Sequence, residues 1–432
     1  MAKSSKTRTE KDSLGQLKVP ADAYFGIFTT RALGNFQISN MRAPAIFRRS
    51  LGLVKSAAAQ ANTSLKQLEP RIGKIIIKAA EEFAEGKFDT DFRLDVIQAG
   101  AGTPFNMNAN EIIANRANVS LKAKLGTNKP IHPNNHVNLG QSSNDVNPST
   151  TKVAILLQLP ALLTEAKKLE KSLATKASQF KSIKKVGRTH LQDAVPIPLG
   201  QEFDAYSRAI TRSRTLIEKV SEDLYELSLG GTAVGTGILA HPKFKKTIVA
   251  NLSKLTGLKL KSAQNLTEAA NNYMPFSDFS STLTSLSSNL FRIAMDLKFL
   301  GSGPNAGLAE LKLPTVQPGS SIMPGKVNPS IPESVEMAHY QVSGNHETVR
   351  LAAMHGQLEL NSNCPIIMYN ILQSIEILTN ICTTFRTRCI DGLTADKKRI
   401  KELYDNSLCE ATALVPKLGY DKVAEMVKKG KL

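Results

Sequence analysis

The sequence contains no tryptophan, and aromatic residues make up only 6% of its 432 residues. The core must therefore consist mainly of leucine, isoleucine, valine and alanine, which is more typical of packed helices than of β-sandwiches. With 27 glycines, 20 prolines and 41% hydrophobic residues, the composition excludes collagen-like and largely disordered chains. We expect a globular protein with an ample core.

Cysteine and long apolar runs are also scarce. The four cysteines lie in the last fifth of the chain without a CxxC pair, so neither a disulfide scaffold nor a metal site is expected. No apolar run approaches the roughly 18 residues that span a bilayer. The polar start MAKSSKTRTEKDSLG lacks the apolar stretch of a secretory signal. We therefore expect a cytoplasmic protein with no membrane partner.

Acidic residues are outnumbered, because 55 lysines and arginines face 37 aspartates and glutamates, which gives a net charge of +18. This balance favours acidic partners such as nucleic acid, a membrane surface or a small polyanion. Lysine-rich stretches such as KFKKTIVANLSKLTGLKLK raise the hypothesis of a nucleic-acid-binding or purely structural helical protein. No RRM, zinc-finger or helix-turn-helix signature accompanies them, and charged helix faces are usually solvated. We therefore expect no nucleic-acid partner and keep that hypothesis as an alternative.

Four segments carry apolar residues at the three- and four-residue spacing of helices that pack along long partners. Residues 278–300 and 371–389 keep alternating gaps of four and three. Helices are also predicted over residues 151–180, where Pro160 should kink or divide the helix, and over residues 201–229. Nothing in the middle of the chain alternates with period two over a useful length. The fold class is therefore predicted to be all-α, a bundle of long helices.

The composition changes near residues 140 and 395. Before residue 140, glycine, proline and asparagine cluster between short predicted helices, and after residue 395 a short basic tail follows. We predict an N-terminal helical domain with a substrate-site loop over residues 1–140, a central long-helix bundle over 141–395 and a short C-terminal helical domain over 396–432.

Four polar stretches interrupt the helical pattern: GAGTPFNMNAN (100–110), QSSND (141–145), GRTHLQD (187–193) and GSSIMPGKVNP (319–329). They place hydroxyls, amides or a cation near glycines that let backbone N–H groups approach a ligand. Such donors, with one lysine and one histidine, suit a small dicarboxylate better than a phosphate. Nucleotide motifs are absent, because Val327 follows Lys326 where a Walker loop needs Ser or Thr, and GGTAVGTG does not fit GxGxxG.

The stretch GSSIMPGKVNP resembles the signature of the fumarase/aspartase superfamily. GRTHLQDA, QSSND, NMNANE and GGTAVGTG resemble further blocks of that family in the expected order, over nearly the whole chain. Adenylosuccinate and argininosuccinate lyases share the GSS-x-MP-x-K-x-N core, but the other blocks point to the fumarase and aspartase branches. The resemblance implies a three-domain fold whose helix bundle forms the core of a homotetramer, with each active site assembled from loops of three subunits.

The resemblance also implies an anti elimination that gives fumarate without a metal or an organic cofactor. A base removes the Cβ proton of a small dicarboxylate, the adjacent carboxylate takes up the charge, and ammonia or water leaves from Cα. Hydrogen-bond donors and a cation must already be in place where that negative charge develops. A serine base needs backbone N–H donors and a closing loop that excludes water, for which Gly319 and Gly325 supply hinges.

Site residues are assigned by their match to the family motifs. Ser320 is the expected catalytic base, and Lys326 with Asn328 clamps the carboxylate that takes up the charge. His190 and Glu333 resemble the family's His–Glu pair, in which the histidine orients the substrate or assists protonation of the leaving group. The expected substrate-binding residues are Thr103, Ser142, Ser143, Asn144, Thr189, His190, Ser321, Lys326 and Asn328.

Two substrates fit the motifs. VPADAYFG, LQDAVP, GQEFDAYSR, VQPGSSIMPGKVNPSIPE, GQLELN and Ala101, where fumarases typically carry serine, resemble the aspartase branch. EKDSLG, LGGTAVGTG, GYDKVAE and Ser143, where aspartases usually carry threonine, resemble the fumarase branch. The longer stretches favour an aspartate ammonia-lyase, which converts L-aspartate to fumarate and ammonia. A class II fumarate hydratase, which interconverts L-malate and fumarate, is the alternative.

Three features depart from the family pattern. Asn305 stands in SGPNAG where the family usually has arginine, NSNCP follows GQLEL in place of a more usual NVMEP-like segment, and residues 396–432 are shorter than the family's C-terminal domain. We expect these departures to affect loop support and regulation more than the chemistry.

Overall fold

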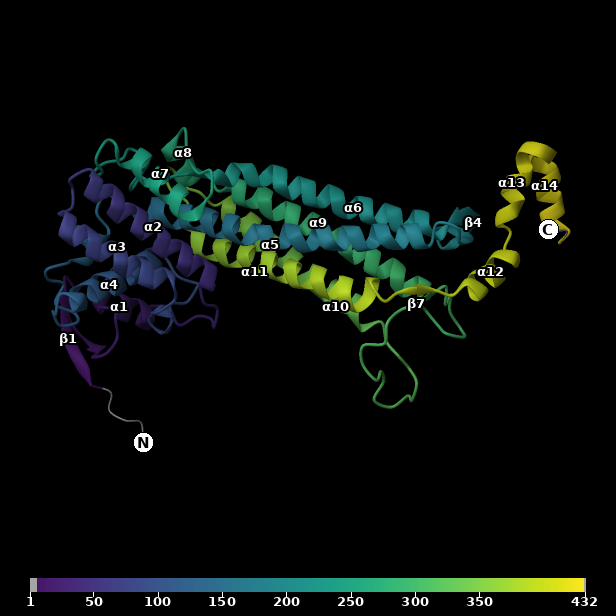
Figure 1. The fold of residues 1–432 in the computed structure, drawn as a ribbon, viewed down its shortest axis with the longest axis horizontal. Coiled ribbons are helices and arrows are strands. Elements are labelled where there is room, and N and C mark those ends of the chain that lie inside the picture. Colours follow the sequence, from purple (N-terminus) through teal and green to yellow (C-terminus); the bar gives the residue numbers. More distant parts are fainter. Residues whose placement is uncertain (1–5, 431–432) are drawn as a thin grey trace. The chain divides into compact units, whose positions relative to one another are not determined.

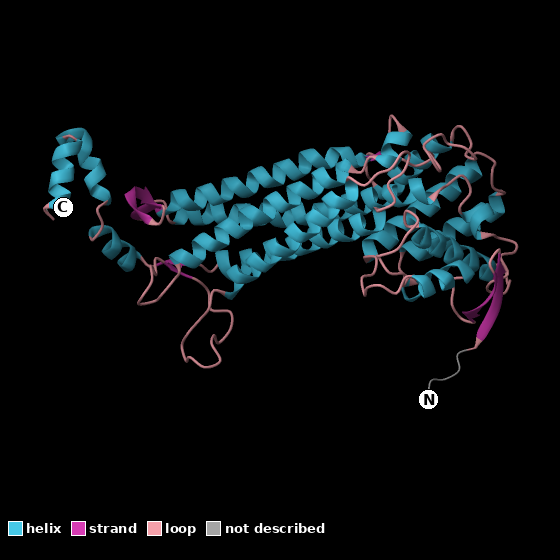
Figure 2. Cartoon of the chain, turned by 180° about the vertical axis from the view of Figure 1, so that it is seen from behind, coloured by secondary structure: helices cyan, strands magenta, loops and turns pink. Residues whose placement is uncertain are grey.

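The computed structural model describes residues 6–430, and helices dominate it (Figures 1 and 2). The helices are α1 (Ile27–Asn35), α2 (Ala45–Ser64), α3 (Pro70–Ala84), α4 (Thr103–Ser120), α5 (Ser143–Gln179), α6 (Leu199–Val220), α7 (Phe244–Thr256), α8 (Leu266–Asn271), α9 (Met274–Leu300), α10 (Ser330–Ala353), α11 (Cys364–Phe385), α12 (Lys397–Asp405), α13 (Cys409–Leu418) and α14 (Tyr420–Lys428). Short 3-10 or π turns occur at Asp89–Asp91, Pro133–Val137, Ser221–Tyr225 and Arg386–Ile390. The predicted all-α fold class is confirmed.

The strands form small two-stranded sheets. Three pairs are antiparallel: β1 (Thr7–Asp12) with β2 (Gly15–Pro20), β3 (Lys184–Thr189) with β4 (Gln192–Pro198), and β7 (Leu311–Lys312) with β8 (Thr394–Ala395). The pair β5 (Glu226–Leu227) with β6 (Lys261–Ser262) is parallel. None of these sheets is large enough to carry a core of its own.

Two compact units divide the chain, and each collects its residues from three stretches. The first unit comprises the chain up to Pro160, Glu218–Ser281 and Gly344–Ile375. The second unit comprises Ala161–Ile217, Thr282–Ser343 and the chain from Glu376 onward. The division into domains 1–140, 141–395 and 396–432 stays a prediction.

The apolar seams that the sequence predicts are buried. In α9 the seam residues are at most 7% exposed: Phe279, Leu283, Leu286, Leu290, Ile293, Leu297 and Leu300. The second seam continues from α11 into the π turn Arg386–Ile390, and its buried residues are Ile371, Ile375, Leu378, Cys382, Phe385 and Cys389. Spacing alone therefore identified the inward faces of these helices correctly.

Two helix boundaries differ from the predictions. α5 begins at Ser143 rather than near residue 151, and it continues through Pro148 and Pro160 without a break. Of the two expected effects of Pro160, the division of the helix is therefore excluded, and the kink stays a prediction. α6 ends at Val220, short of residue 229, because a 3-10 turn at Ser221–Tyr225 and strand β5 follow it.

The hairpin β3–β4 departs most from the sequence expectation, because no strand was predicted in the middle of the chain. Most of its residues are exposed or half-buried on both faces, so the apolar alternation of a half-buried strand is missing. Pro196 and Pro198 in β4 also read as turn or loop residues in the sequence. The hairpin carries two of the expected site residues, Thr189 and His190, at its tip.

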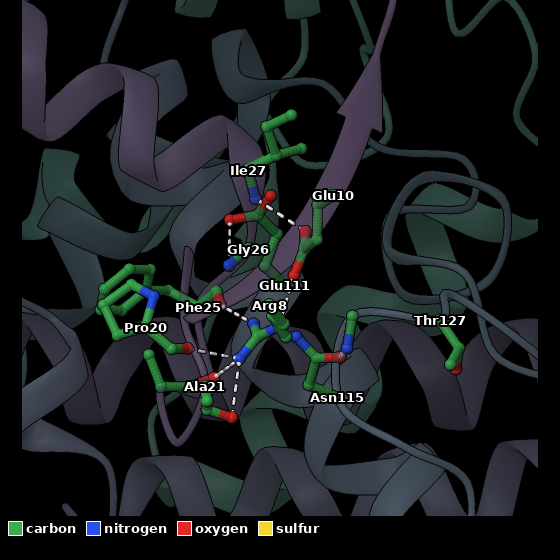
Figure 3. A network of polar contacts seen from close by, with 12 residues as sticks. Arg8, Glu10, Pro20, Ala21, Phe25, Gly26, Ile27, Glu111, Asn115 and Thr127 are labelled. Atoms are coloured by element: carbon green, nitrogen blue, oxygen red, sulfur yellow. Dashed lines mark hydrogen bonds and ion pairs between the residues drawn. The ribbon is translucent and has the colours of Figure 1, made fainter. Parts of the chain in front are cut away.

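A network around Arg8 fastens the N-terminal segment to α1 and α4 (Figure 3). The Arg8 guanidinium bonds the Glu10 carboxylate at 2.8 Å and donates to four backbone carbonyls, those of Pro20, Ala21, Ala23 and Phe25. Glu10 accepts the N–H of Ile27 at 2.9 Å, and Glu111 of α4 accepts the N–H of Gly26 at 2.9 Å. Glu111 thus ties the start of α1 to the helix that begins at Thr103.

The C-terminal segment folds as the short helices α12, α13 and α14. Within the second unit, the Lys184 ammonium of β3 lies 2.7 Å from the Glu410 carboxylate of α13 and above the ring of Tyr404. The four cysteines are buried free thiols. Over residues 6–430, no helix combines the length and apolarity needed to cross a membrane.

Candidate active site

The turn before α4 carries three consecutive residues with positive φ, namely Gly100 at 70°, Ala101 at 53° and Gly102 at 77°. Thr103, the first residue of the helix, donates its hydroxyl to the carbonyl of Gly100 at 2.6 Å. Ala101 is only 1% exposed, and its carbonyl accepts the Asn147 amide at 2.8 Å. A left-handed conformation costs a residue with a side chain about 1–2 kcal/mol. Such strain persists where the surrounding contacts fix the backbone, as at functional sites.

Ser142, Ser143 and Asn144 form the entry into α5. The carboxylate of Asp145 accepts the N–H of Ser142 at 3.0 Å, and the Ser142 hydroxyl accepts the N–H of Asn144 at 3.2 Å. This reciprocal pattern is a variant of the capping box in which the Ser142 hydroxyl bonds the second rather than the third helical N–H, and it satisfies backbone donors that would otherwise be free at a helix start. The Ser143 hydroxyl accepts the Asn106 amide at 3.2 Å. The QSSND motif is therefore a helix cap whose hydroxyls and amides are held in place by the same contacts.

Asp145, to which the motifs assigned no role, joins this turn to the GGTAVGTG stretch. Its second carboxylate oxygen accepts the N–H groups of Gly230 at 3.0 Å and Thr232 at 2.9 Å. The Asn144 amide adds a bond to the carbonyl of Ala233 at 2.8 Å. Burial raises the pKa of the Asp145 carboxyl to about 6, against the lowering effect of these N–H donors. The glycine-rich stretch thus holds the Ser142–Asn144 turn of the first unit.

Lys55, in α2, is a second buried charge beneath the same turn. Its ammonium donates to the side-chain oxygens of Asn106 at 2.6 Å, Asn138 at 3.1 Å and Gln141 at 2.9 Å. The side chain is fully buried, and burial lowers the pKa of the ammonium to about 7, while the Asp145 carboxylate raises it. The sequence does carry a signal for this residue: Lys55 is the one cation in the stretch SLGLVKSAAAQAN.

Thr189 and His190 lie at the tip of the β3–β4 hairpin in the second unit. The two residues between the strands, His190 and Leu191, have φ values of 55° and 62°. Two-residue hairpin loops of this kind favour Asn-Gly, because both positions are left-handed. Here a histidine and a leucine occupy them, and both side chains are exposed. The hairpin therefore holds the imidazole outward at an energetic cost.

The loop over residues 319–329 closes on itself. The N–H of Ser320 donates to the carbonyl of Lys326 at 2.9 Å, and a Cβ on Gly319 would lie 1.9 Å from that oxygen, so only glycine fits there. The Ser320 hydroxyl oxygen accepts the N–H of Ile322 at 3.3 Å and that of Met323 at 3.2 Å. These are backbone donors of the kind that a serine base needs.

The other predicted residues of the second unit are available to a ligand. Ser321 and Lys326 are exposed, while Asn328 and Glu333, the latter in the first turn of α10, are half-buried. Within residues 6–430 no hydrogen bond or ion pair engages the side chain of Ser321, Lys326 or Glu333. An exposed lysine ammonium without a protein partner suits a carboxylate.

The expected site residues fall into two groups. Thr103, Ser142, Ser143 and Asn144 belong to the first unit, and the others belong to the second unit: Thr189, His190, Ser320, Ser321, Lys326, Asn328 and Glu333. In the part of the chain that the structure describes, no hydrogen bond or ion pair joins His190 to Glu333. The His–Glu pair therefore stays a prediction.

Comparison with known proteins decides the family. A family model described as lyase matches residues 15–344. The class II fumarate hydratase of Brucella suis is 47% identical over 423 residues, which cover 98% of this chain and 91% of that protein. An aspartate ammonia-lyase of a Bacillus species is 44% identical over 425 residues, with the same coverage of both chains. The chain belongs to the fumarase/aspartase superfamily of lyases.

Solved structures of this superfamily share the fold. A fumarate lyase:delta crystallin from Brucella melitensis, bound to cobalt, matches with a TM-score of 0.95 at 45% identity, covering 98% of this chain and 93% of that chain. The class II fumarase of Schistosoma mansoni matches with a TM-score of 0.95 at 36% identity, covering 98% and 92%. The family resemblance that the motifs indicated is therefore confirmed. The prediction that the protein is an enzyme of the lyase class is confirmed as well.

Replacement of Lys55 by methionine tests the buried ammonium. Because the pKa of about 7 in the folded protein lies below the ordinary lysine value of 10.5, the unfolded chain binds one more proton between those two values. Relative to Lys55→Met, the wild-type free energy of unfolding should therefore rise between pH 7 and 9, by up to about 1.4 kcal/mol per pH unit. Denaturant titrations at pH 7, 8 and 9 measure this difference.

The matched control is Lys74→Met, which removes an exposed lysine from α3. Its profile should run parallel to that of the wild type. Parallel profiles for wild type and Lys55→Met would contradict the depressed pKa.

Proposed function

We propose that the protein catalyses the anti elimination of ammonia from L-aspartate to give fumarate. The observation that supports the elimination chemistry most directly is the environment of Ser320, whose hydroxyl oxygen accepts two backbone N–H groups, in a loop where the Ser320 N–H bonds the carbonyl of Lys326. Such donors stabilise negative charge on the oxygen and let a serine act as a base. These two N–H donors are a physical argument for Ser320 as the base, in addition to the match of the loop to the family signature.

In the proposed reaction, Ser320 takes the Cβ proton of the substrate. The electron pair left behind moves into the adjacent carboxylate and then returns to form the Cα=Cβ double bond, while the Cα–N bond breaks and ammonia leaves with the electrons of that bond. The exposed ammonium of Lys326 and the amide of Asn328 are the groups proposed to bind that carboxylate as its charge grows. Closure of the 319–329 loop would exclude water from the serine.

The remaining polar groups are proposed to orient the substrate. Thr103 and the Ser142–Asn144 turn offer hydroxyls and amides from the first unit. From the second unit, Thr189, Ser321 and His190 contact the substrate, with Glu333 as the expected partner of the histidine. No metal or organic cofactor takes part in this scheme.

We further propose that the protein acts as a homotetramer whose active sites combine loops of three subunits. Three large apolar side chains of α10 and that of Met354, directly after the helix, are at least half exposed; those in the helix are Met337, Tyr340 and Leu351. Their spacings of 3, 11 and 3 place them on one face of the helix. An exposed apolar stripe of this kind is typical of a subunit contact.

A class II fumarate hydratase is the second candidate. Ser143, where the aspartase branch usually carries threonine, supports it, as does the 47% identity to the Brucella suis enzyme of that name. Ala101 and the longer aspartase-like blocks, LQDAVP and GQLELN among them, support aspartate. We therefore keep aspartate as the first proposal.

Purified protein should produce fumarate from L-aspartate, seen as rising ultraviolet absorbance with an equal release of ammonia. L-Malate, run in parallel, should give fumarate at a rate at least tenfold lower. Fumarate from malate alone would replace the proposal by the hydratase. If neither substrate gave fumarate, both candidate functions would be contradicted.

Ser320→Ala should lower kcat by about 10²–10⁴-fold, because it removes the base but leaves the substrate-binding groups in place. Steady-state kinetics measure the loss, and size-exclusion chromatography checks that the assembly is unchanged. Ser178→Ala, which removes an exposed hydroxyl from α5, is the matched control and should keep the wild-type rate. A Ser320→Ala enzyme that retained most of its rate would overturn the assignment of the base.

A further inference from the structure

A cluster of four charged side chains lies under the β3–β4 hairpin of the second unit. Glu310 is fully buried, Lys185 is 1% exposed, and the side chains of Arg188 and Glu202 are 14% and 20% exposed. The charges of two cations and two carboxylates therefore cancel within a largely buried cluster. None of the four has a part in the reaction proposed above.

The contacts in this cluster converge on Glu310. One carboxylate oxygen accepts from the Arg188 guanidinium at 2.6 Å, and the other lies 3.2 Å from the Lys185 ammonium. Lys185 also bonds Glu202 of α6 at 2.8 Å. Glu310 thus crosslinks two residues of β3, and Lys185 extends the link to α6.

An irregularity in β3 makes this convergence possible. Residues three apart in a regular strand point to opposite faces, so Lys185 and Arg188 should not reach one carboxylate. The register of β3 against β4 shifts between Val186 and Arg188, as in a β-bulge. Gly187 permits it, because a Cβ there would lie 2.6 Å from the carbonyl of Val195.

Arg188 directly precedes the strained tip of the hairpin. Thr189 follows it, and His190 and Leu191 have the positive φ values described above. A strained turn keeps one conformation only where its surroundings fix it. The side chains of Thr189 and His190 are exposed, so the nearest fixed side chain on β3 is that of Arg188.

We propose that Glu310 is a positioning residue, which holds Arg188 and thereby fixes the orientation of Thr189 and His190 toward the substrate. This inference rests on the proposed lyase function. Glu310 also immediately precedes β7 (Leu311–Lys312), on the segment that leads into the 319–329 loop. The same carboxylate therefore anchors the hairpin and the stem of the loop that carries Ser320.

Glu310→Asp is the main test, because it keeps the negative charge and withdraws the carboxylate by one methylene. Displacement of a substrate-orienting group by about 1 Å can cost about 100-fold in rate. We expect kcat to fall 10- to 100-fold with little change in the thermal midpoint. Glu310→Gln leaves two buried cations without their partner and should lower the thermal midpoint as well.

The matched control is Glu170→Asp in the same unit, where the carboxylate of α5 bonds Arg214 of α6 at 3.2 Å. It should leave kcat unchanged. If Glu170→Asp and Glu310→Asp lost the same fraction of kcat, the loss would be explained by general destabilisation of the protein. That result would overturn the proposal.

A double-mutant cycle with His190→Ala separates positioning from stability. If Glu310 acts through the hairpin tip, Glu310→Asp should cost less than about 5-fold in kcat once the imidazole is gone. The same fold-loss in both backgrounds would overturn the proposal, because a purely structural role costs the same in each.

A readout without substrate distinguishes failure of this inference from failure of the proposed function. Hydrogen exchange of the backbone amides of residues 189–192 should be at least tenfold faster in Glu310→Asp than in the wild type, with exchange in α9 unchanged. Unchanged exchange at the turn would overturn the positioning role whether or not aspartate or malate is turned over. Faster exchange in a protein that turns over neither substrate would support the positioning role of Glu310 and contradict only the lyase proposal.

Discussion

Buried charge is the constraint on which the polar loops of this protein depend. Lys55 and Asp145 lie beneath the Ser142–Asn144 turn, and Glu310 lies beneath the hairpin that carries His190. A charged group taken from water into the interior loses several kcal/mol of hydration unless its partners replace that water. Any movement of these loops would break such bonds and leave a charge uncompensated. These bonds therefore restrain the Ser142–Asn144 turn and the β3–β4 hairpin.

Much of the helical framework could be predicted from the sequence, because its signal is local. A residue such as Leu290 lies on the buried face of α9 for the same reason that its neighbours three and four positions away do. The site motifs were also readable, since a loop that closes on a backbone oxygen demands glycine at one position, as at Gly319. Local steric rules of this kind leave a mark in the sequence that does not depend on distant residues.

The parts that could not be predicted depend on distant partners. Lys55 is bonded to Asn106, and Arg188 to Glu310, across 51 and 122 residues of sequence. No spacing rule connects such pairs. The β3–β4 hairpin was missed because neither of its faces is consistently apolar. Pro160 failed to divide α5 because packing on both sides of it, seen in the buried Leu159 and Leu162, outweighs the local cost of the proline.

The choice between aspartate and malate is a question about acceptors. Lys326 and Asn328 would bind a carboxylate that both substrates possess, so this clamp cannot discriminate between them. A substrate ammonium offers three N–H donors, whereas the malate hydroxyl offers one O–H. The Asn144 amide nitrogen is engaged by the carbonyl of Ala233, which leaves its oxygen as an acceptor. Each further oxygen acceptor near the substrate Cα would favour aspartate over malate, because the ammonium has more N–H groups to donate. Under the proposed function, groups that face Cα, such as the Asn144 amide oxygen, would set the specificity, and the signature loop would set the chemistry.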